Sequence, residues 1–245
     1  MTIAANVKII QERIIDVCDR IGRDPNEIIL MGVTKFVPKE KIAQAYQTGI
    51  RYFGESRVKE AVGKFEDFKN EFPDSKLHMI GSLQRNKVKQ SLKLFDCIQS
   101  VDRMELVDEL IKQSCKDSIL PEEVPIEVLL ELHTGEETKS GFTDLDSLFK
   151  AVELILENAN RKVVNHKPAL RPMGLMTMAP FTTDTDLIRS SFRQVKKAQE
   201  ELEKRFLLKE NWACLSMGMS NDFEIAIEEG STLLRIGSAI FEDSK

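Results

Sequence analysis

The sequence has few of the features that divide a chain into several domains. Its 245 residues include only 12 glycines and 8 prolines, and no window rich in glycine, serine or proline separates two parts. Repeats at the short periods typical of solenoids are also lacking. No linker is visible, so we expect a single domain over residues 1–245.

Cysteine is scarce and widely spaced. Cys18, Cys97, Cys115 and Cys214 form no Cys-x-x-Cys pair, and no histidine stands at the spacing of a metal ligand. This pattern argues against a disulfide framework and against a zinc site, so we expect no metal. Reduced thiols are typical of a cytoplasmic protein, which is the location we expect.

The chain also lacks an excess of positive charge and a long apolar run. Its 35 basic and 40 acidic residues give a net charge of -5. This balance argues against a general nucleic-acid or membrane-surface binder, although a local basic pocket for a small anion remains compatible with it. Residues 1–20 have apolar side chains at helical spacing with charged residues between them, which predicts an amphipathic helix rather than a signal peptide or membrane span.

Short apolar runs alternate with helical stretches along the rest of the chain, with helices expected near Pro38, Arg57 and Gln84. Continuous apolar runs are typical of buried parallel strands, and eight of them in about 250 residues usually close into a barrel. The predicted fold is therefore a single α/β barrel of the (β/α)8 or TIM type, with an open doubly wound sheet as the alternative. The expected strands are 28–35, 50–55, 76–83, 97–102, 126–132, 172–177, 213–219 and 232–240.

Polar residues stand at the C-terminal ends of several of these strands. They include Lys35, Glu55, Asp102, Ser220 and Arg235. A TIM barrel collects its site at these ends, so the pattern favours the barrel. Strands must end in polar turns anyway, which explains Glu55 or Asp102 equally well but Lys35 and Arg235 less well.

Lys35 is the candidate nucleophile. It ends an apolar run and precedes Phe36 and Val37, so its amine is expected in a low-dielectric barrel mouth. Burial favours the free amine, which attacks aldehydes. A surface lysine at a strand end is the alternative that this segment alone leaves open.

A phosphate site is expected beside the seventh and eighth strands. Residues 215–222 pass from a strand through Gly218 into a helix, for which Ser220 or Asn221 is a natural N-cap. Helix N-termini bind phosphate, and Gly237-Ser238 in the neighbouring loop allows close approach of an anion. Capping alone would explain the serine equally well.

Seven short motifs between about residues 28 and 241 occur together in one known family. They are Val33-Thr34-Lys35, Phe53-Gly54-Glu55, His78-x-Ile80-Gly81-x-Leu83-Gln84-x-Asn86-Lys87, Lys139-Ser140-Gly141, Gly174-Leu175-Met176, Ser216-Met217-Gly218-Met219-Ser220-x-Asp222 and Arg235-Ile236-Gly237. Through them the chain resembles the YggS/PROSC family of pyridoxal phosphate homeostasis proteins.

The resemblance implies a fold and a cofactor. The fold is a barrel like the N-terminal domain of alanine racemase, and the cofactor is pyridoxal 5'-phosphate (PLP), bound to Lys35 as an internal aldimine. Ser220, Gly237 and Ser238 stand at positions that hold the phosphate, and Arg235 would face the pyridine nitrogen.

Other residues of these motifs are implied to lie in or near the cofactor pocket. His78, Asn86 and Met219 lie in motifs that line or support the cofactor pocket, although His78 is equally compatible with a core histidine. The chain departs from the family at Ser56 and Leu132, where asparagine is usual. Ser56 can still form hydrogen bonds, whereas Leu132 cannot, which puts one polar contact to the cofactor in doubt.

The residues favour a PLP carrier with little or no turnover over an enzyme. A racemase needs a second base opposite the lysine, and the only tyrosines, Tyr46 and Tyr52, fall inside predicted elements away from the expected site. A guanidinium at the pyridine nitrogen also makes the ring a poor electron sink. The alternatives are a PLP-dependent amino-acid racemase or lyase using Lys35 alone, and a phosphate-binding isomerase using Glu55.

Partners and assembly are expected to be simple. The partners that the resemblance implies are PLP and PLP-dependent apo-enzymes that receive it. The chain ends soon after the eighth predicted strand, so we expect no racemase-like second domain and no racemase-like dimer contact. A monomer is the expected state.

Overall fold

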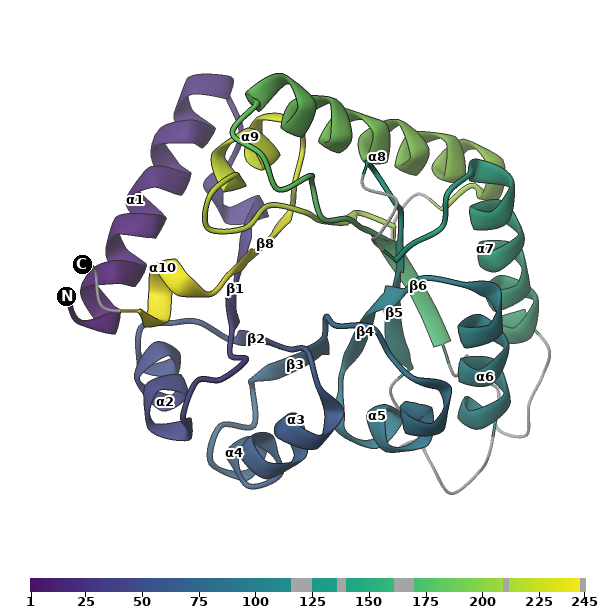
Figure 1. The fold of residues 1–245 in the computed structure, drawn as a ribbon, viewed down its shortest axis with the longest axis horizontal. Coiled ribbons are helices and arrows are strands. Elements are labelled where there is room, and N and C mark those ends of the chain that lie inside the picture. The colour runs from purple at the N-terminus through teal and green to yellow at the C-terminus, as the bar shows by residue number, and fades with distance from the viewer. Residues whose placement is uncertain (116–124, 136–139, 161–169, 209–211, 243–245) are drawn as a thin grey trace.

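The computed structural model describes residues 1–115, 125–135, 140–160, 170–208 and 212–242. Eight parallel strands close into a barrel in the order of the sequence, and helices surround it (Figure 1). This confirms the predicted (β/α)8 barrel and rejects the open sheet. The strands are β1 (Ile29–Val33), β2 (Tyr52–Glu55), β3 (Lys76–Met79), β4 (Cys97–Val101), β5 (Ile126–Glu131), β6 (Leu170–Met176), β7 (Cys214–Ser216) and β8 (Leu233–Ile236).

The helices follow the strands in regular alternation. They are α1 (Ile3–Ile21), α2 (Lys39–Gln47), α3 (Val58–Phe65), α4 (Phe68–Glu71), α5 (Val88–Leu94), α6 (Met104–Ser114), α7 (Leu145–Asn160), α8 (Thr185–Phe206), α9 (Phe223–Glu228) and α10 (Ser238–Phe241), with short 3-10 turns η1 (Pro25–Glu27) and η2 (Arg85–Lys87). The expected helix starts near Pro38 and Arg57 are confirmed as the N-caps of α2 and α3.

The N-terminal helix α1 completes the outer ring of helices. Its N-cap Thr2 accepts a hydrogen bond from the main chain of Ala5 (3.2 Å), and Gly22 ends it in the left-handed conformation that suits glycine. The helix packs against α2, α9 and α10 (Figure 1). The side chain of the buried Asn6 donates to the main-chain oxygen of Ile240 (3.0 Å), which ties this helix to the C-terminal segment.

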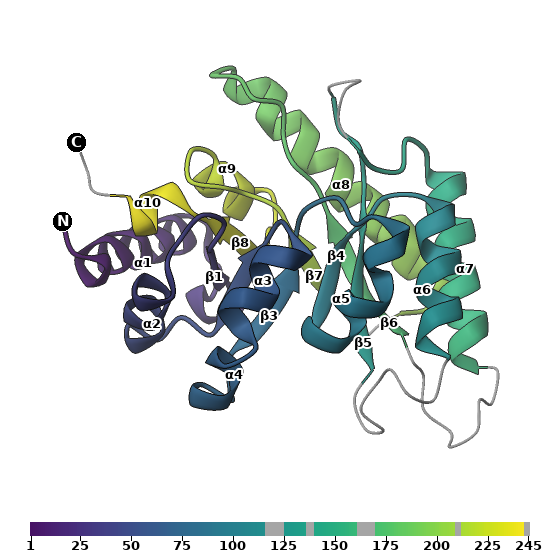
Figure 2. The same ribbon diagram turned by 60° about the horizontal axis from the view of Figure 1, so that its bottom comes forward.

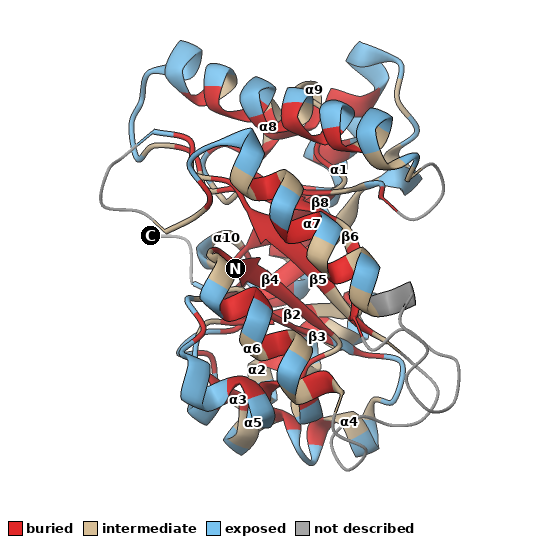
Figure 3. Cartoon of the chain, turned by 90° about the vertical axis from the view of Figure 1, so that its right-hand side faces the viewer, coloured by how far each residue is buried: buried red, intermediate tan, exposed pale blue. Residues whose placement is uncertain are grey.

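The core has an inner and an outer part, as expected for this architecture. The strands are buried along nearly their whole length, and the helices bury only the faces turned toward the barrel (Figure 3). Pairing of Ile29 with Leu233 and of Met31 with Arg235 joins β1 to β8 and closes the ring. Of the described helices, none is both long and apolar enough to cross a membrane.

The predicted eighth strand was too long. Residues 232–240 were expected as one strand, whereas β8 ends at Ile236 and residues from Ser238 form α10. The reason is that the main-chain N–H groups of Ile240 and Phe241 both donate to the oxygen of Gly237, and both side chains are buried in the hydrophobic core. The apolar residues of α10 were therefore mistaken for a continuation of the eighth strand.

The segment before α9 also differs from the prediction. Asp222, not Ser220 or Asn221, is the N-cap of this helix, and its Oδ1 accepts from the main chain of Met219 (2.5 Å). Gly218 bends the chain just before Met219 with a φ of 96°, where a Cβ atom would meet Ala226 at 2.6 Å. Because Asp222 occupies the N-cap position, the Ser220 hydroxyl is available for other partners.

Candidate functional site

A cavity of about 930 Å³ opens at the C-terminal ends of the strands. Loops after β1, β6, β7 and β8 supply most of its lining, together with Ile188 near the start of α8. Figure 2 shows the first turns of α8 extending past the ends of the strands. Six of the eight predicted site residues line it: Lys35, Met219, Ser220, Arg235, Gly237 and Ser238. The loops bring together residues that lie 200 positions apart in the sequence.

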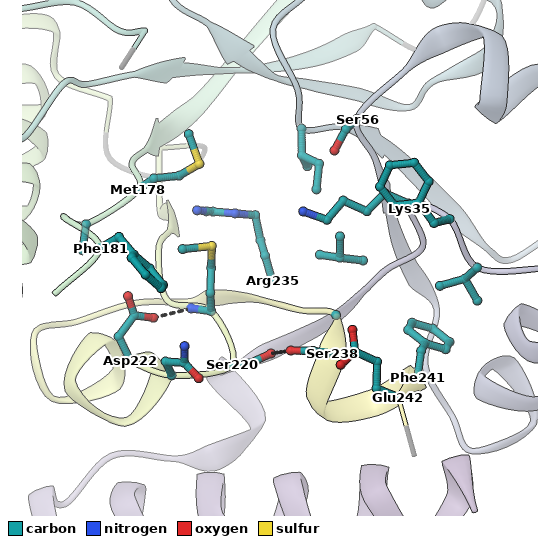
Figure 4. Close-up of a pocket in the computed structure, with 18 of the residues that line it drawn as sticks. Lys35, Ser56, Met178, Phe181, Ser220, Asp222, Arg235, Ser238, Phe241 and Glu242 are labelled. Carbon is teal, nitrogen blue, oxygen red and sulfur yellow. Dashed lines mark hydrogen bonds between the residues drawn. The ribbon is translucent and has the colours of Figure 1, made fainter. Parts of the chain in front are cut away.

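Lys35 extends into this cavity from a tight turn after β1 (Figure 4). The turn is closed by a hydrogen bond from the main chain of Val37 to the oxygen of Thr34 (2.9 Å). Phe36, its third residue, has a φ of 62°, a conformation that costs a non-glycine residue about 1 kcal/mol. The Lys35 amine has no hydrogen bond or ion pair within the described part of the chain, so it is available to a ligand.

Beneath this turn lies a buried ion pair. Glu55 is fully buried at the end of β2, and its Oε1 accepts from the Thr34 hydroxyl (2.7 Å) and from the Lys64 ammonium on α3 (2.9 Å). Lys64 also donates to the Thr34 main-chain oxygen (2.8 Å). Glu55 therefore holds the turn and does not line the cavity, which removes the observation that supported a Glu55-based isomerase.

Arg235 forms the floor of the cavity at the end of β8. Its side chain is buried, with one Nη donating to the main-chain oxygen and the hydroxyl of Ser216 (2.6 and 2.7 Å) and the other donating to the main-chain oxygen of Thr177 (2.7 Å). Desolvation lowers the pKa of the guanidinium, while the charges of Glu131 and Asp222 raise it. A guanidinium keeps its charge under such conditions, so the floor is a fixed cation.

Ser220 and Ser238 meet on the next side of the cavity (Figure 4). The Ser238 hydroxyl donates to that of Ser220 (3.1 Å), and the main chain of Ala239 in the first turn of α10 also donates to Ser220 (3.4 Å). Gly237 precedes them, and its Cβ position lies 3.4 Å from Val33. Two hydroxyls and main-chain N–H groups of a helix start are a donor set that suits phosphate.

Two predicted residues lie away from the cavity. His78 is buried in the barrel interior, where its Nδ1 lies 2.8 Å from Nε2 of Gln99, and desolvation lowers its pKa to about 4. Asn86 is exposed in η2. Neither lines the cavity. Lys139, part of one family motif, falls outside the described residues.

The positions that depart from the family pattern differ in their consequences. Ser56 lines the cavity and presents a hydroxyl there. Leu132 is buried in the hydrophobic core and pairs through its backbone with Phe142, so its side chain offers the cavity nothing polar.

Glu131 is a buried titratable residue that sequence reasoning missed, although it does not line the cavity itself. It ends β5, is 3% exposed, and accepts a hydrogen bond from the Ser140 hydroxyl (3.2 Å). Burial, followed by the charge of Asp102, raises its pKa to about 7, while the Ser140 hydrogen bond and the charge of Arg235 act in the opposite direction. A carboxylate at a strand end was the signal available.

Comparisons with known proteins agree with this geometry. The family described as "Alanine racemase, N-terminal domain" matches residues 4–245. The chain is 38% identical to the pyridoxal phosphate homeostasis protein of Aquifex aeolicus, over 96% of this chain and 95% of that protein. It is 35% identical to the protein of the same name in Escherichia coli K12, over 98% of this chain and 95% of that protein.

Solved structures give the same result. The chain matches PipY of Synechococcus elongatus PCC7942, a structure with PLP bound, with a TM-score of 0.79 and 26% identity over 98% of this chain and all of that one. Alanine racemase of E. faecalis shares the fold alone, with a TM-score of 0.64 and 17% identity over 100% of this chain and 59% of that one. The chain therefore belongs to the family of pyridoxal phosphate homeostasis proteins, built on the barrel of the alanine racemase N-terminal domain.

Proposed function

We propose that this protein binds PLP in the cavity, holds it covalently through Lys35, and serves in PLP homeostasis rather than in catalysis. The observation that carries the proposal is the meeting of three groups in one cavity: the amine of Lys35, the fixed cation of Arg235 and the hydroxyl pair of Ser220 and Ser238. When bound, PLP supplies an aldehyde that a lysine amine attacks and a phosphate that needs hydrogen-bond donors.

Each residue has a distinct task in this proposal. Lys35 is the nucleophile, and its turn keeps the amine inside the cavity. Ser220, Ser238 and the main chain after Gly237 bind the phosphate. Arg235 donates to the pyridine nitrogen, which keeps that nitrogen free of its own proton and weakens its capacity to accept electrons. Lys35 and the phosphate donors thus explain why PLP is retained, and Arg235 explains why the bound PLP has low reactivity.

The cavity lining supports low turnover. Among the described residues that line it there is no tyrosine, cysteine or histidine. Tyr46 instead donates to Asp74 on the outer surface, and Tyr52 packs edge-on against His78 in the interior. The described lining therefore offers no tyrosine opposite Lys35 to return a proton, which disfavours the racemase or lyase alternative. Its carboxylates are Glu242 and Asp222, and Oδ1 of Asp222 already accepts from the main chain of Met219 (2.5 Å).

Borohydride trapping tests the assignment of Lys35. Protein loaded with PLP and reduced should carry a stable adduct on Lys35, found by tryptic mapping, and Lys35→Ala should lose both the adduct and the absorption of the bound cofactor while remaining folded. Lys87→Ala is the control and should keep the adduct. An adduct on Lys41, Lys87 or Lys139 in the native chain would overturn the assignment.

Two further measurements address the carrier role. Mixed with L- or D-alanine or L-serine, the loaded protein should show no racemisation or elimination near the roughly 1 per second typical of enzymes. It should pass PLP to a PLP-dependent apo-enzyme, compared against free PLP at equal concentration. A turnover in the enzyme range that disappears in Lys35→Ala would establish the racemase or lyase instead.

A further inference from the structure

A chain of four polar side chains crosses the interior of the barrel beneath the cavity. It begins at Arg235 on β8 and passes through Ser216 on β7 and Gln99 on β4 to His78 on β3. The successive distances are 2.7, 2.7 and 2.8 Å. All four residues are at most 5% exposed, and only Arg235 reaches the cavity.

The donor and acceptor properties of these groups fix the direction of the chain. Arginine has only donors, so the Ser216 oxygen must accept from Arg235 and has its own proton left to donate. Gln99 therefore turns its oxygen to Ser216 and its NH₂ group to His78. His78 must then accept at Nδ1, which requires a neutral ring with its proton on Nε2.

The buried position of His78 fits this requirement. Desolvation lowers the pKa of its ring to about 4, so the ring is neutral at pH 7. The edge of its ring packs against Tyr52 at a centroid distance of 5.6 Å, in the T-shaped geometry of aromatic pairs. The acceptor at the far end of the chain is thus held in place, and with it the orientation of the Gln99 amide.

At the other end, the chain restricts Arg235. Three of the five guanidinium N–H groups are committed to Ser216 and Thr177. Two N–H groups remain for a ligand on the cavity floor. An arginine held this way presents a donor in a fixed place, and it has no freedom to turn away when the ligand's ring nitrogen carries a proton of its own.

We propose that Gln99 and Ser216 are positioning residues that hold Arg235 as an obligatory hydrogen-bond donor to the ring nitrogen of PLP, with His78 as the terminal acceptor that fixes the direction of the chain. This inference rests on the proposed function for the identity of the ligand. It assigns to three interior residues a task in the cofactor's electronics, although none of them touches the cavity.

The consequence of breaking the chain follows from the loss of one acceptor. Without the Gln99 oxygen, the Ser216 proton must find another partner, and the hydroxyl then competes with Arg235 for the same main-chain oxygens. The guanidinium loosens, and the ring nitrogen takes a proton in a larger fraction of molecules. Weakening one such hydrogen bond reduces PLP retention by about fivefold.

The first experiment uses the protein without added PLP, so it does not depend on the proposed function. Nitrogen NMR of the imidazole rings reports which nitrogen carries the proton, and substitution of His133 and His166 assigns the signal of His78. We expect the Nε2–H form in the native chain. In Gln99→Glu both carboxylate oxygens accept, so His78 should carry a proton on Nδ1. A native ring protonated on Nδ1 would overturn the proposal.

The second experiment measures the ring nitrogen of PLP directly. Protein loaded with ¹⁵N-labelled PLP should show an unprotonated pyridine nitrogen, and Gln99→Leu should move its signal toward the protonated value. Gln199→Leu is the matched control, because Gln199 is also buried, on α8, and among the described residues its side chain donates to the main chain of Trp212 (2.8 Å) and not to this row of hydrogen-bonded side chains. Equal spectra for the two leucine variants would overturn the proposal.

Ser216 keeps the test decisive if Gln99→Leu fails to fold. Ser216→Ala should move the pyridine signal in the same direction, whereas Ser216→Thr retains a hydroxyl and should restore it. Ser231→Ala, which removes another fully buried hydroxyl near the same strands, should leave the signal unchanged. If alanine and threonine at 216 behave alike, Ser216 is no positioning residue. A native protein that binds no PLP would instead contradict the proposed function. The protonation state of His78 would still decide the direction of the hydrogen bonds from Arg235 to His78.

Discussion

The two sides of the cavity are held by different kinds of interaction. Lys35 stands on a turn that is supported from outside the barrel by the ion pair of Glu55 and Lys64. Arg235 is held from inside the barrel by uncharged acceptors, the oxygens of Ser216 and Thr177. One side pairs two opposite charges, and the other surrounds a single charge with dipoles.

This difference suits the proposed tasks of the two residues. The Lys35 amine forms no hydrogen bond or ion pair with the residues that the structure describes, as suits a group that must form and break a covalent bond. Arg235 is restricted by three hydrogen bonds and changes no bond of its own. The proposed formation and breakage of the covalent bond are thus confined to the Lys35 side of the cavity, and the Arg235 side keeps the same hydrogen bonds.

The largest expected effect comes from breaking the ion pair on the Lys35 side. Lys64→Met leaves the fully buried Glu55 without its cation and should lower the free energy of unfolding by about 4 kcal/mol at pH 7, measured by urea denaturation. Lys39→Met is the control, because its ion pair with Glu71 is exposed and should contribute below about 1 kcal/mol. Adding Glu55→Gln to Lys64→Met should recover most of the loss; equal losses for Lys64→Met and Lys39→Met would contradict a buried pair.

The Arg235 side should show opposing pH effects from two buried groups. His78 has a pKa of about 4 in the folded chain instead of 6.5, so the unfolded chain binds its proton more tightly and stability falls as the pH drops from 6.5 to 4. Glu131 has a pKa of about 7 instead of 4.5, so its contribution is present below pH 4.5 and is lost as the pH rises through 7. Between pH 4.5 and 6.5 the two slopes cancel.

Glu131→Gln should remove the Glu131 contribution to the pH dependence and leave that of His78 unopposed. The difference in unfolding free energy between native and Glu131→Gln protein should change by about 3 kcal/mol between pH 4.5 and 7, measured by urea titrations across that range. Glu127→Gln is the control on the same strand, where the carboxylate is partly exposed and bonds to Arg171. A difference that does not vary with pH would show that Glu131 titrates normally.

A smaller effect is expected where the two sides meet at the phosphate donors. Ser220→Ala removes a hydroxyl bonded to Ser238 and Ala239 but no cap of α9, so it should weaken PLP retention by about tenfold while changing the unfolding free energy by less than 1 kcal/mol. Equilibrium dialysis and thermal denaturation measure the two quantities. Unchanged retention would remove Ser220 from the phosphate site, and inorganic phosphate should compete with PLP only if the site exists.

The smallest effect concerns the turn of Lys35. Phe36 has a φ of 62° and is 75% exposed, so Phe36→Asn relieves backbone strain at little cost in packing. It should raise the unfolding free energy by about 0.5 kcal/mol and leave the Lys35 adduct in place. Phe181→Asn, at another exposed aromatic of the cavity rim, lacks the positive φ and should bring no such gain. A loss of stability in Phe36→Asn would show that the ring is needed for packing.

Local sequence signals predicted the fold and one side of the site well. Eight apolar runs with polar C-terminal ends specify a barrel because strand and helix periods are local properties. Lys35 and Arg235 were correctly expected in the cavity, since the end of a barrel strand always faces the same rim. The N-cap of α9 and the end of β8 were wrong, because hydrogen bonds to Gly237 and Met219 decided them.

The other residues of the site became visible only in three dimensions. His78 and Asn86 stood in family motifs, yet one lies in the interior and the other on the surface. Gln99 carries no local signal that sets it apart, since it is one of two neighbouring polar residues, with Ser100, inside an otherwise apolar strand. Its partner Ser216 lies 117 positions away on the far side of the barrel.

The sequence by itself determined the alternation of strands and helices and the family, and it indicated Lys35 as the candidate nucleophile. Tertiary structure alone decided which buried polar groups meet: Glu55 with Lys64, Gln99 with His78, and Glu131 with Ser140. The physical reason is that burial patterns depend on neighbours along the chain, whereas contacts across a barrel depend on strand register. Between β5 and β6, for example, Val128 pairs with Pro172 but Leu129 pairs with Gly174, so one extra residue of β6 shifts every later pair of these strands.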